Sequence, residues 1–384
     1  MRIEQMIERE DFYEILRKTV CEYFKNVRCE SVDFTYTKKE NCDCLVINPK
    51  FSFVAKSPLK KGIREFLKNE YNIRNSFAKY VIGRVAVFSV EVNPYICGGK
   101  RAYITKNSLK RNEFISPQNR SIRFFDYDKM TVDCIVKSGF TDKYIKNQIE
   151  FRKNCSYDFV LPMLDFGENW FRERILQGHA LARTTDNSLY LKGVNDTIDA
   201  VKTLIKDTYK RLGTCEYVTM LADEAKKLIC LADEKKHIKY KKEMVKIIDI
   251  CRENAMCLEF VPSSLNHGDL QSGNIWIEKG GNTVIYDWET VGRRSVWYDL
   301  SVFKYSLRRA GAWEKYIASD ISDILEDCNC KIFSADMQKS VKSVVMLEDL
   351  IFRLTDMIDL PGQWGADIFD DYSMQLIPYV NVRA

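Results

Sequence analysis

The segment that most constrains this chain runs from residue 265 to residue 289 and reads LNHGDLQSGNIWIEKGGNTVIYDWE. A polar loop precedes two short apolar runs, NIWIEK and TVIYDWE, which are joined by Gly280-Gly281-Asn282. Two strand-like runs around a glycine-rich turn are typical of a β-hairpin. A carboxylate at the end of a buried strand needs a cation or strong donors, because its unpaired burial is costly. The segment therefore predicts a hairpin that carries a charged site.

The polar residues of this segment have the spacing of a phosphate-handling site. Asn274 follows Asp269 by five residues, and Asp287 follows it by 18 (287 − 269), after the second apolar run. Carboxylate and amide oxygens are ligands that Mg²⁺ prefers, usually together with phosphate oxygens. We therefore expect Asn274 and Asp287 to hold a metal ion. Asp269 could orient and deprotonate a hydroxyl group that attacks phosphorus.

Composition narrows the class of protein further. The chain has 384 residues, of which 46% are hydrophobic and 29% charged, so it can bury a large core. A net charge of +5, spread over 59 basic and 54 acidic residues, is not the footprint of a nucleic-acid-binding surface. The N-terminus carries early acidic residues, and no apolar run reaches membrane-spanning length. We expect a cytoplasmic protein with neither nucleic acid nor membrane as a partner.

The cysteines do not indicate a metal centre or a disulfide framework. There are 13 of them, scattered along the chain without a CxxC pair, and only three histidines accompany them. Structural zinc sites usually need paired ligands at short spacing. We therefore expect reduced thiols, most of them buried.

The order of predicted elements indicates an α+β fold with two lobes. Residues 108–178 read as strands around one helix, TDKYIKNQIEFRKN, and form a mixed sheet-and-helix lobe. Residues 179–384 are dominated by helical periodicity and carry the hairpin. Residues 1–107 form an additional α/β region, in which the alternating run RVAVFSVEV predicts a strand.

Three motifs in this order resemble the aminoglycoside phosphotransferase/choline kinase family of the protein-kinase-like superfamily. The run HGDLQSGN (267–274) matches the family's HGDxxxxN catalytic loop, and YDWE (286–289) stands where the family has its metal-binding Asp. The run WYDL (297–300) matches the downstream YDL segment. The resemblance covers about residues 112–358 and implies a protein-kinase-like fold, with a mixed N-lobe sheet and a mainly helical C-lobe.

The resemblance also implies an activity and a set of roles. The activity is transfer of a phosphoryl group from ATP, with Mg²⁺, to a hydroxyl of a small molecule, and GTP remains open as the nucleotide. Asp269 is then the catalytic residue, while Asn274 and Asp287 bind the metal. His267 and Asp299 support the catalytic loop.

A lysine for the nucleotide phosphates, with a glutamate to hold it, is also implied. CIVK, followed by KYIKNQIEFRK, supplies Lys137 and Glu150. FVAK supplies a rival, Lys56, with Glu65 or Glu70 on the helix after it. The first lysine precedes the loop aspartate by 132 residues (269 − 137), as is typical of the family, against 213 (269 − 56) for the second. We therefore expect the pair Lys137–Glu150.

Two more residues complete the expected nucleotide site. Glu173 lies where the family's hinge begins, and Ser121 closes the run SPQNRS (116–121), which replaces a glycine-rich phosphate loop. The acceptor could be an amino alcohol, a sugar or an aminoglycoside-like amine. The alternatives are a peptide or protein kinase, and a nucleotide-binding pseudokinase scaffold that binds a partner through residues 1–107.

Overall fold

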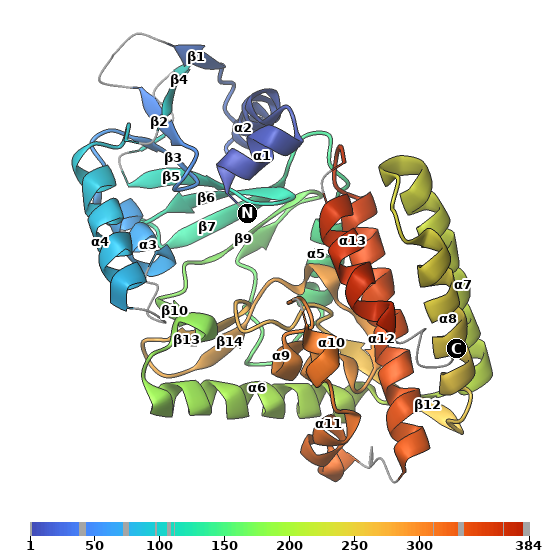
Figure 1. Cartoon of the computed structure of the whole chain (residues 1–384). Coiled ribbons are helices and arrows are strands. Elements are labelled where there is room, and N and C mark those ends of the chain that lie inside the picture. The colour runs from blue at the N-terminus through green and yellow to red at the C-terminus, as the bar shows by residue number, and fades with distance from the viewer. Residues whose placement is uncertain are drawn as a thin grey trace. The chain divides into compact units, whose positions relative to one another are not determined.

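The structure is a computed structural model of the chain (Figure 1). It describes residues 2–37, 44–71, 77–96, 98–105, 109–110, 112–309, 311–328, 334–363 and 365–378. Contacts divide the chain into two compact units. Unit 1 comprises residues 1–189 and 276–284, and unit 2 comprises residues 190–275 and 285–384.

Unit 1 is built on a nine-stranded sheet with the order β1-β4-β2-β3-β5-β6-β7-β9-β8. Its strands are β1 (Phe34–Thr37), β2 (Leu45–Asn48), β3 (Phe53–Lys56), β4 (Lys100–Ile104), β5 (Glu113–Pro117), β6 (Ser121–Asp126), β7 (Thr131–Val136), β8 (Asp165–Phe166) and β9 (Trp170–Arg174). We expected a mixed sheet, with parallel and antiparallel strands. Every pairing between neighbouring strands of this sheet is instead antiparallel. Short hairpins connect β2 to β3, β5 to β6 and β6 to β7, and a hairpin reverses the strand direction.

The faces of this sheet are covered by five helices. They are α1 (Ile3–Arg9), α2 (Phe12–Val27), α3 (Lys61–Glu70), α4 (Phe77–Val92) and α5 (Lys143–Lys153). One face packs against α1 and α2 through Ile3, Met6, Leu16, Val20, Ile115, Ile122, Phe124 and Ile135. The other face packs against α3 and α4 through Phe53 and Phe114, and against α5 through Cys134 and Val136. Alternate residues of each strand thus serve different helices, as the two-residue period of a strand requires.

Helix α4 includes the run RVAVFSVEV, so the strand expected there is wrong. Its valines and phenylalanine alternate as in a strand, but the backbone is helical from Phe77 to Val92. Ile82 and Phe88 are 67% and 65% exposed, whereas Val87 and Val90 pack on α3 and β5. Packing on one helical face has overridden the strand preference of β-branched residues.

The sheet joins the additional N-terminal region to the strands that follow it. β3 pairs with β5, with Val54 opposite Ile115 and Ala55 opposite Phe114. The first four strands therefore continue the same sheet as the strands of residues 113–174. The three expected regions, with boundaries at residues 107 and 178, stay a prediction.

Unit 2 is mainly helical, as we expected. Its helices are α6 (Asn187–Thr208), which begins at the end of unit 1, α7 (Thr214–Lys236), α8 (Lys241–Ala255), α9 (Tyr298–Tyr305), α10 (Ala312–Lys315), α11 (Ala318–Ile324), α12 (Ala335–Ile358) and α13 (Ala366–Leu376). Helices α7, α8 and α12 pack on one another, and Figure 1 shows them side by side. A three-stranded sheet has the order β11 (Lys210–Gly213), β12 (Phe260–Asn266), β15 (Gly292–Ser295).

The predicted hairpin is present. Its strands, β13 (Ile275–Glu278) and β14 (Thr283–Ile285), form a second three-stranded sheet with β10 (Gly178–Ala180). The tip of the hairpin belongs to unit 1, and its base, which carries the polar residues, belongs to unit 2. The α+β class with a helical second part is confirmed.

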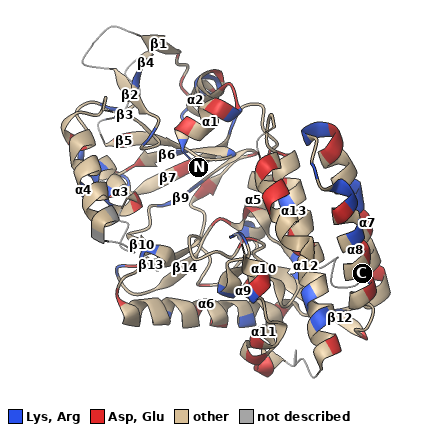
Figure 2. Ribbon diagram, in the orientation of Figure 1, with Lys and Arg blue, Asp and Glu red and all other residues tan. Residues whose placement is uncertain are grey.

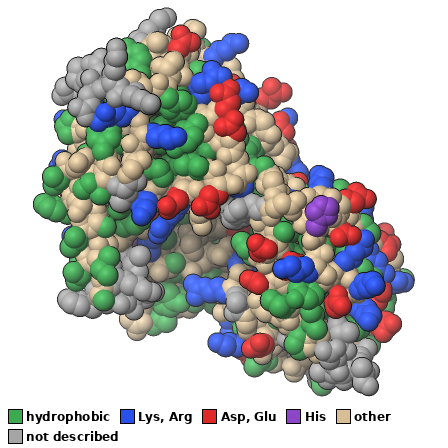
Figure 3. Space-filling model, turned by 45° about the horizontal axis from the view of Figure 1, so that its top comes forward, with side chains coloured by type: hydrophobic (Ala, Val, Ile, Leu, Met, Phe, Trp, Pro, Cys, Tyr) green, Lys and Arg blue, Asp and Glu red, His purple; other side chains and the backbone are tan. Residues whose placement is uncertain are grey.

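Charge is interspersed over the surface of unit 2. Figure 2 shows basic and acidic residues mixed along α7 and α8, and the space-filling view in Figure 3 shows both signs side by side over these helices. No helix in the described part of the chain is long and apolar enough to cross a membrane.

Candidate active site

The catalytic loop follows β12 and is held in place by Asp299, near the start of α9. The carboxylate of Asp299 is buried and accepts hydrogen bonds from the backbone N–H groups of His267 (2.6 Å) and Gly268 (2.9 Å). Burial raises the pKa of Asp299, and the two N–H donors oppose that change. The Asp299 backbone N–H donates in turn to the side-chain oxygen of Asn266 (3.2 Å). One buried carboxylate therefore fixes the backbone on which the loop begins.

His267 links this loop to the end of the hairpin. Its Nδ1 accepts from the backbone N–H of Asp269 at 3.2 Å, and its Nε2 donates to the carbonyl of Tyr286 at 2.9 Å. These two partners require a neutral imidazole with its proton on Nε2. The ring is fully buried and lies 4.6 Å from the ring of Trp288. His267 is therefore placed to brace the loop and not to transfer protons to a ligand.

Gly268 is required by the path of the backbone. Its φ of +87° lies in the left-handed region, which residues other than glycine rarely adopt. A Cβ atom at this position would collide with the carbonyl oxygen of Thr290. The hydroxyl of Thr290 also donates to the carbonyl of His267, at 3.0 Å. The chain segments before and after the hairpin thus approach each other closely at this glycine.

Asn274 and Asp287 lie together at the base of the hairpin. The backbone N–H of Tyr286 donates to the carbonyl of Asn274 at 3.1 Å, which brings the two positions together. The Asn274 amide nitrogen donates to the carbonyl of Asp269 at 2.9 Å, so its Oδ1 points away from that contact. Asp287 has a left-handed backbone (φ 70°, ψ 52°), which is uncommon outside glycine and concentrates at functional sites.

These two residues fit Mg²⁺ by the chemistry of their donor atoms. One amide oxygen and one carboxylate are hard ligands, and Mg²⁺ is commonly held by one or two such groups together with phosphate oxygens and water. Within the described ranges, no group of three or more His, Cys, Asp and Glu side chains is arranged to hold a metal ion. With these two protein ligands, the remaining ligands of the ion would be phosphate oxygens and water.

Asp269 is half-buried and held from two sides. Its Oδ1 accepts from Nε of Arg308 (3.0 Å) and from Nε2 of Gln271 (2.9 Å), and its Oδ2 accepts from the same Gln271 nitrogen at 3.0 Å. Arg308 was not found from the sequence. It lies 39 residues after Asp269 and belongs to none of the three motifs, so no local pattern indicates the contact.

In unit 1 the expected ion pair between Lys137 and Glu150 is wrong. The buried ammonium of Lys137 donates to the carboxylate of Glu10 at 2.6 Å, whereas Glu150 is exposed and lies near Asn154. Lys137 continues strand β7 and shares the face of Ile135, which α1 and α2 cover. Helix α5, which carries Glu150, packs on the opposite face.

The surroundings of Lys137 also change its titration. Burial lowers the pKa of Lys137 to about 8, and the Glu10 carboxylate opposes that change. The neighbouring Arg9 binds Glu10 and also donates to the Asn119 carbonyl at 2.9 Å. Asn119 belongs to the turn before Ser121, where the backbone N–H of Gln118 donates to the Ser121 carbonyl at 2.8 Å. Arg9 and Glu10, at the end of α1, therefore hold both the lysine and the turn before Ser121.

A different ion pair joins α5 to the sheet. Arg152 of α5 binds Glu173 of β9 at 2.8 Å, and both side chains are buried. The acid is thus on the strand and the cation on the helix, which reverses the order that we expected for this face. Glu173 lies inside β9 and not after it, and its carboxylate is bound to Arg152.

The acids that could have served the rival lysine have partners elsewhere in unit 1. Glu70 binds Arg183 at 2.9 Å, and Glu65 lies 4.0 Å from Lys61. Lys56 ends β3 and is half-buried. The choice between Lys56 and Lys137 as the phosphate-contacting lysine stays a prediction.

Comparison with known proteins bears on the part of the chain that carries this site. Residues 220–319, which are 100 of the 384, match the phosphotransferase enzyme family. The match includes the catalytic loop, Asp287 and Asp299. No match is found among curated proteins. The resemblance stated from the motifs is confirmed over these residues.

Several solved structures are similar to this one at low sequence identity. A thermostable aminoglycoside phosphotransferase APH(4)-Ia has 15% identity and a TM-score of 0.45, with 69% of this chain and 93% of that chain covered. Choline kinase LicA from Streptococcus pneumoniae has 12% identity and a TM-score of 0.46, with 71% of this chain and 91% of that chain covered. An ethanolamine kinase from Plasmodium vivax has 13% identity and a TM-score of 0.44, with 84% of this chain and 95% of that chain covered. At these identities and TM-scores the solved structures carry no argument about the activity of this chain.

Proposed function

We propose that this protein transfers a phosphoryl group from ATP, in the presence of Mg²⁺, to a hydroxyl of a small molecule. The observation that carries the proposal is the braced loop, in which buried Asp299 fixes the backbone that presents Asp269. Asn274 and Asp287 lie together at the base of the same hairpin. A scaffold that only binds nucleotide has no need of all three polar side chains.

The proposed chemistry depends on positioning and on charge. Asp269 orients the acceptor hydroxyl and accepts its proton as the oxygen attacks phosphorus. Asn274, through Oδ1, and Asp287 would hold the metal ion, which neutralises phosphate charge when bound. Phosphoryl transfer asks for little covalent work by the protein, so correct placement of these groups supplies most of the acceleration.

The nucleotide side of the proposal rests on unit 1. Ser121 and the turn before it are the proposed phosphate contacts. Lys137 would reach a phosphate only by exchanging the Glu10 carboxylate for phosphate oxygens, and Glu150 is not proposed as its partner. Glu173 could contribute through its backbone atoms, because its carboxylate is bound to Arg152.

The acceptor of the proposed transfer is a hydroxyl of a small molecule. Similar structures are named for aminoglycosides, choline and ethanolamine, which supports an amino alcohol, a sugar or an amine-bearing sugar as the acceptor. GTP could replace ATP. We propose a cytoplasmic location, with no nucleic acid or membrane partner.

The test uses the full chain with ATP or GTP, Mg²⁺ and a panel of amino alcohols, sugars and aminoglycosides. Transfer should appear with at least one acceptor. Asp269→Asn should abolish it while nucleotide binding persists, and Asp287→Ala should weaken Mg²⁺-dependent nucleotide binding. Asp323→Asn, the same chemical change at an exposed position of α11, should leave both unchanged.

Two results would count against the proposal. Nucleotide binding without turnover on any acceptor would favour the pseudokinase alternative. Turnover that survives Asp269→Asn would remove that residue from its proposed role.

A further inference from the structure

Arg308 holds the proposed catalytic carboxylate through a direct ion pair. It follows α9, and its Nε donates to Oδ1 of Asp269 at 3.0 Å. Its Nη2 donates to the carbonyl of Gly268 and to the hydroxyl of Tyr298, both at 3.0 Å. Its Nη1 donates to Asp349 of α12. One guanidinium thus contacts the carboxylate and the backbone of the catalytic loop, and also two helices.

The hydrogen-bonding capacity of Arg308 is almost filled by protein groups. A guanidinium has five N–H donors, and these contacts occupy four of them. The group also lies 3.7 Å from the ring centre of Phe352. Asp349 is fully buried and is held on its other oxygen by Arg353, at 2.9 Å. Arg308 is therefore fixed by α12 and has little capacity left to bind a substrate itself.

The contacts leave the two oxygens of Asp269 unequal. From the described residues, Oδ1 receives two N–H donors, from Arg308 and Gln271, while Oδ2 receives one, from Gln271. Oδ1 is therefore turned towards the protein. Oδ2 has more of its accepting capacity left for a hydroxyl proton.

We infer that Arg308 is a positioning residue, which fixes the Asp269 carboxylate so that Oδ2 meets the acceptor hydroxyl. The inference rests on the proposed function of Asp269. A misplacement of about 1 Å in a reacting group can lower a rate on the order of 100-fold. The loss should therefore appear in kcat, with the KM for nucleotide almost unchanged.

The test compares Arg308→Ala, Arg308→Lys and the control Arg309→Ala, whose side chain is exposed beside it. Arg308→Ala should lower kcat on the order of 100-fold. Added guanidinium chloride at low concentration should restore part of the rate, and Arg308→Lys should keep part of it. A purely structural defect would not respond to guanidinium. Arg309→Ala should match the wild type.

A crystal structure of Arg308→Ala separates this inference from the proposed function. We expect the Asp269 carboxylate to rotate away from its wild-type position. An unmoved carboxylate would overturn the inference even if the wild type proved to be active. If the wild type transferred nothing, the proposed function would fail, and the position of Asp269 in this variant would still decide the role of Arg308.

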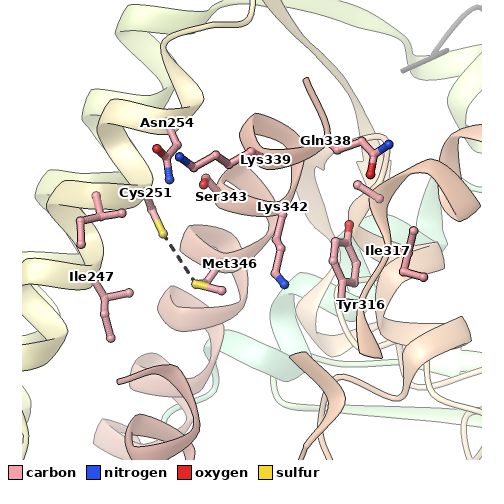
Figure 4. A pocket seen from close by; sticks show the side chains of 12 residues that line it. Ile247, Cys251, Asn254, Tyr316, Ile317, Gln338, Lys339, Lys342, Ser343 and Met346 are labelled. Atoms are coloured by element: carbon pink, nitrogen blue, oxygen red, sulfur yellow. Dashed lines mark hydrogen bonds between the residues drawn. The ribbon is translucent and has the colours of Figure 1, made fainter. Parts of the chain in front are cut away.

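A pocket in unit 2 carries a second, independent inference. It lies between α8, α12 and the segment before α11, and its volume is about 520 Å³ (Figure 4). Small-molecule sites are commonly of this size and mainly apolar. Its apolar lining consists of Ile247, Ile250, Cys251, Tyr316, Ile317, Ala318 and Met346. No residue of the catalytic loop lines it.

The charged residues that line this pocket are both cationic, Lys339 and Lys342. Lys342 is half-buried, and burial lowers the pKa of its ammonium. Its Nζ donates to the carbonyl of Trp313 at 3.1 Å, and Figure 4 shows its side chain extending between Met346 and Tyr316. Apolar walls together with two cationic side chains suit a ligand that combines an apolar body with one negative group.

We propose that this pocket binds a small organic anion with an apolar body, such as an aromatic or aliphatic carboxylate or sulfonate. The apolar body would bury against α8 and α12, and the anionic group would lie at Lys342. A hydrogen bond to a charged group is stronger than one between neutral groups. An anion should therefore bind on the order of 10-fold more tightly than a neutral compound of the same shape.

A matched pair of fluorescent probes tests this proposal on the full chain. 8-Anilinonaphthalene-1-sulfonate carries the apolar body and the anion, and N-phenyl-1-naphthylamine carries the same body without charge. We expect the sulfonate to bind one site on the order of 10-fold more tightly. Lys342→Met should remove that difference, and Ala318→Trp should weaken both probes by filling the pocket.

The control is Lys315→Met, at an exposed position of α10 near the pocket, which should leave both affinities unchanged. Far-UV circular dichroism checks that each variant is folded. Equal affinity of the two probes for the wild type would overturn the proposal. So would an unaltered preference for the sulfonate in Lys342→Met.

Discussion

The partner of Lys137 can be decided by removing two glutamates in turn. Glu10→Ala takes the carboxylate away from an ammonium whose side chain is 0% exposed. Glu150→Ala takes away the carboxylate that the sequence indicated, which is exposed on α5. Glu8→Ala, at an exposed position of α1, is the control for the same substitution at a neighbouring surface position. The three variants differ mainly in whether a buried cation loses its partner.

The expected losses of unfolding free energy differ by several kcal/mol. Removing one partner of a buried ion pair costs about 3–5 kcal/mol. Lys137 can limit its share by losing its proton. Relative to the wild type, whose folded pKa is about 8, this costs no more than about 1.4 kcal/mol at pH 7, from one pH unit at about 1.36 kcal/mol. Glu150→Ala and Glu8→Ala should each stay within about 0.5 kcal/mol of the wild type.

The cost of Glu10→Ala should fall as the pH rises. At pH 9 this share is close to zero, because Lys137 of the wild type, with a pKa of about 8, is already mostly deprotonated. In the wild type the pKa of Lys137 is lowered to about 8 in the folded state, so the unfolded chain binds more protons between about 8 and 10.5. The contribution of Lys137 to stability therefore rises with pH across that window.

Urea unfolding followed by circular dichroism at pH 7 and pH 9 measures these differences. We expect Glu10→Ala to be the least stable variant at pH 7 and to recover part of the loss at pH 9. The remaining part belongs to Arg9, which also loses its partner and stays charged. A loss for Glu150→Ala as large as that for Glu10→Ala would refute the assignment of Glu10 as the partner. A loss for Glu10→Ala that does not change with pH would refute the explanation by a buried ammonium.

Two further substitutions probe the catalytic loop. Asp299→Asn should lower the unfolding free energy by about 1–3 kcal/mol and reduce turnover, because the N–H groups of His267 and Gly268 lose a charged acceptor. Urea unfolding measures the first effect and a transfer assay the second. An unchanged unfolding midpoint would contradict this prediction. Gly268→Ala should also destabilise the fold, by about 1 kcal/mol or more, because of its positive φ and the collision with Thr290. Gly273→Ala, whose Cβ would meet nothing within 4 Å, is the matched control for the unfolding midpoint.

The parts of the site that the sequence predicted are those that depend on short spacing. The loop 267–274, the hairpin and the position of Asp287 follow from offsets of a few residues, and the structure has them in the predicted elements. Residues a few positions apart are placed relative to each other by local backbone geometry, and this geometry can be predicted from a short stretch of sequence. The fold class followed for the same reason, from the order and periodicity of the elements.

The parts that the sequence did not predict are contacts between distant segments. Glu10 lies 127 residues from Lys137, and Arg308 lies 39 residues from Asp269. No periodicity or motif connects such positions. The error at Glu150 had a different cause, because only the spacing along the chain was considered. Side chains alternate between the two faces of a strand, so Lys137 lies on the face of Ile135. Helix α5, which carries Glu150, packs on the opposite face.

The pairing of β3 with β5 sets the smallest piece of this protein that can be handled alone. All five residues of β5 are buried, and one of its sides is bonded to β3. A chain started at residue 112, where the resemblance to a phosphotransferase begins, would leave that side of β5 as an open edge of unpaired N–H and C=O groups. Such an edge is a template for association with other chains. A fragment chosen by motif would therefore aggregate, and any shorter version has to keep the strands that cover β5.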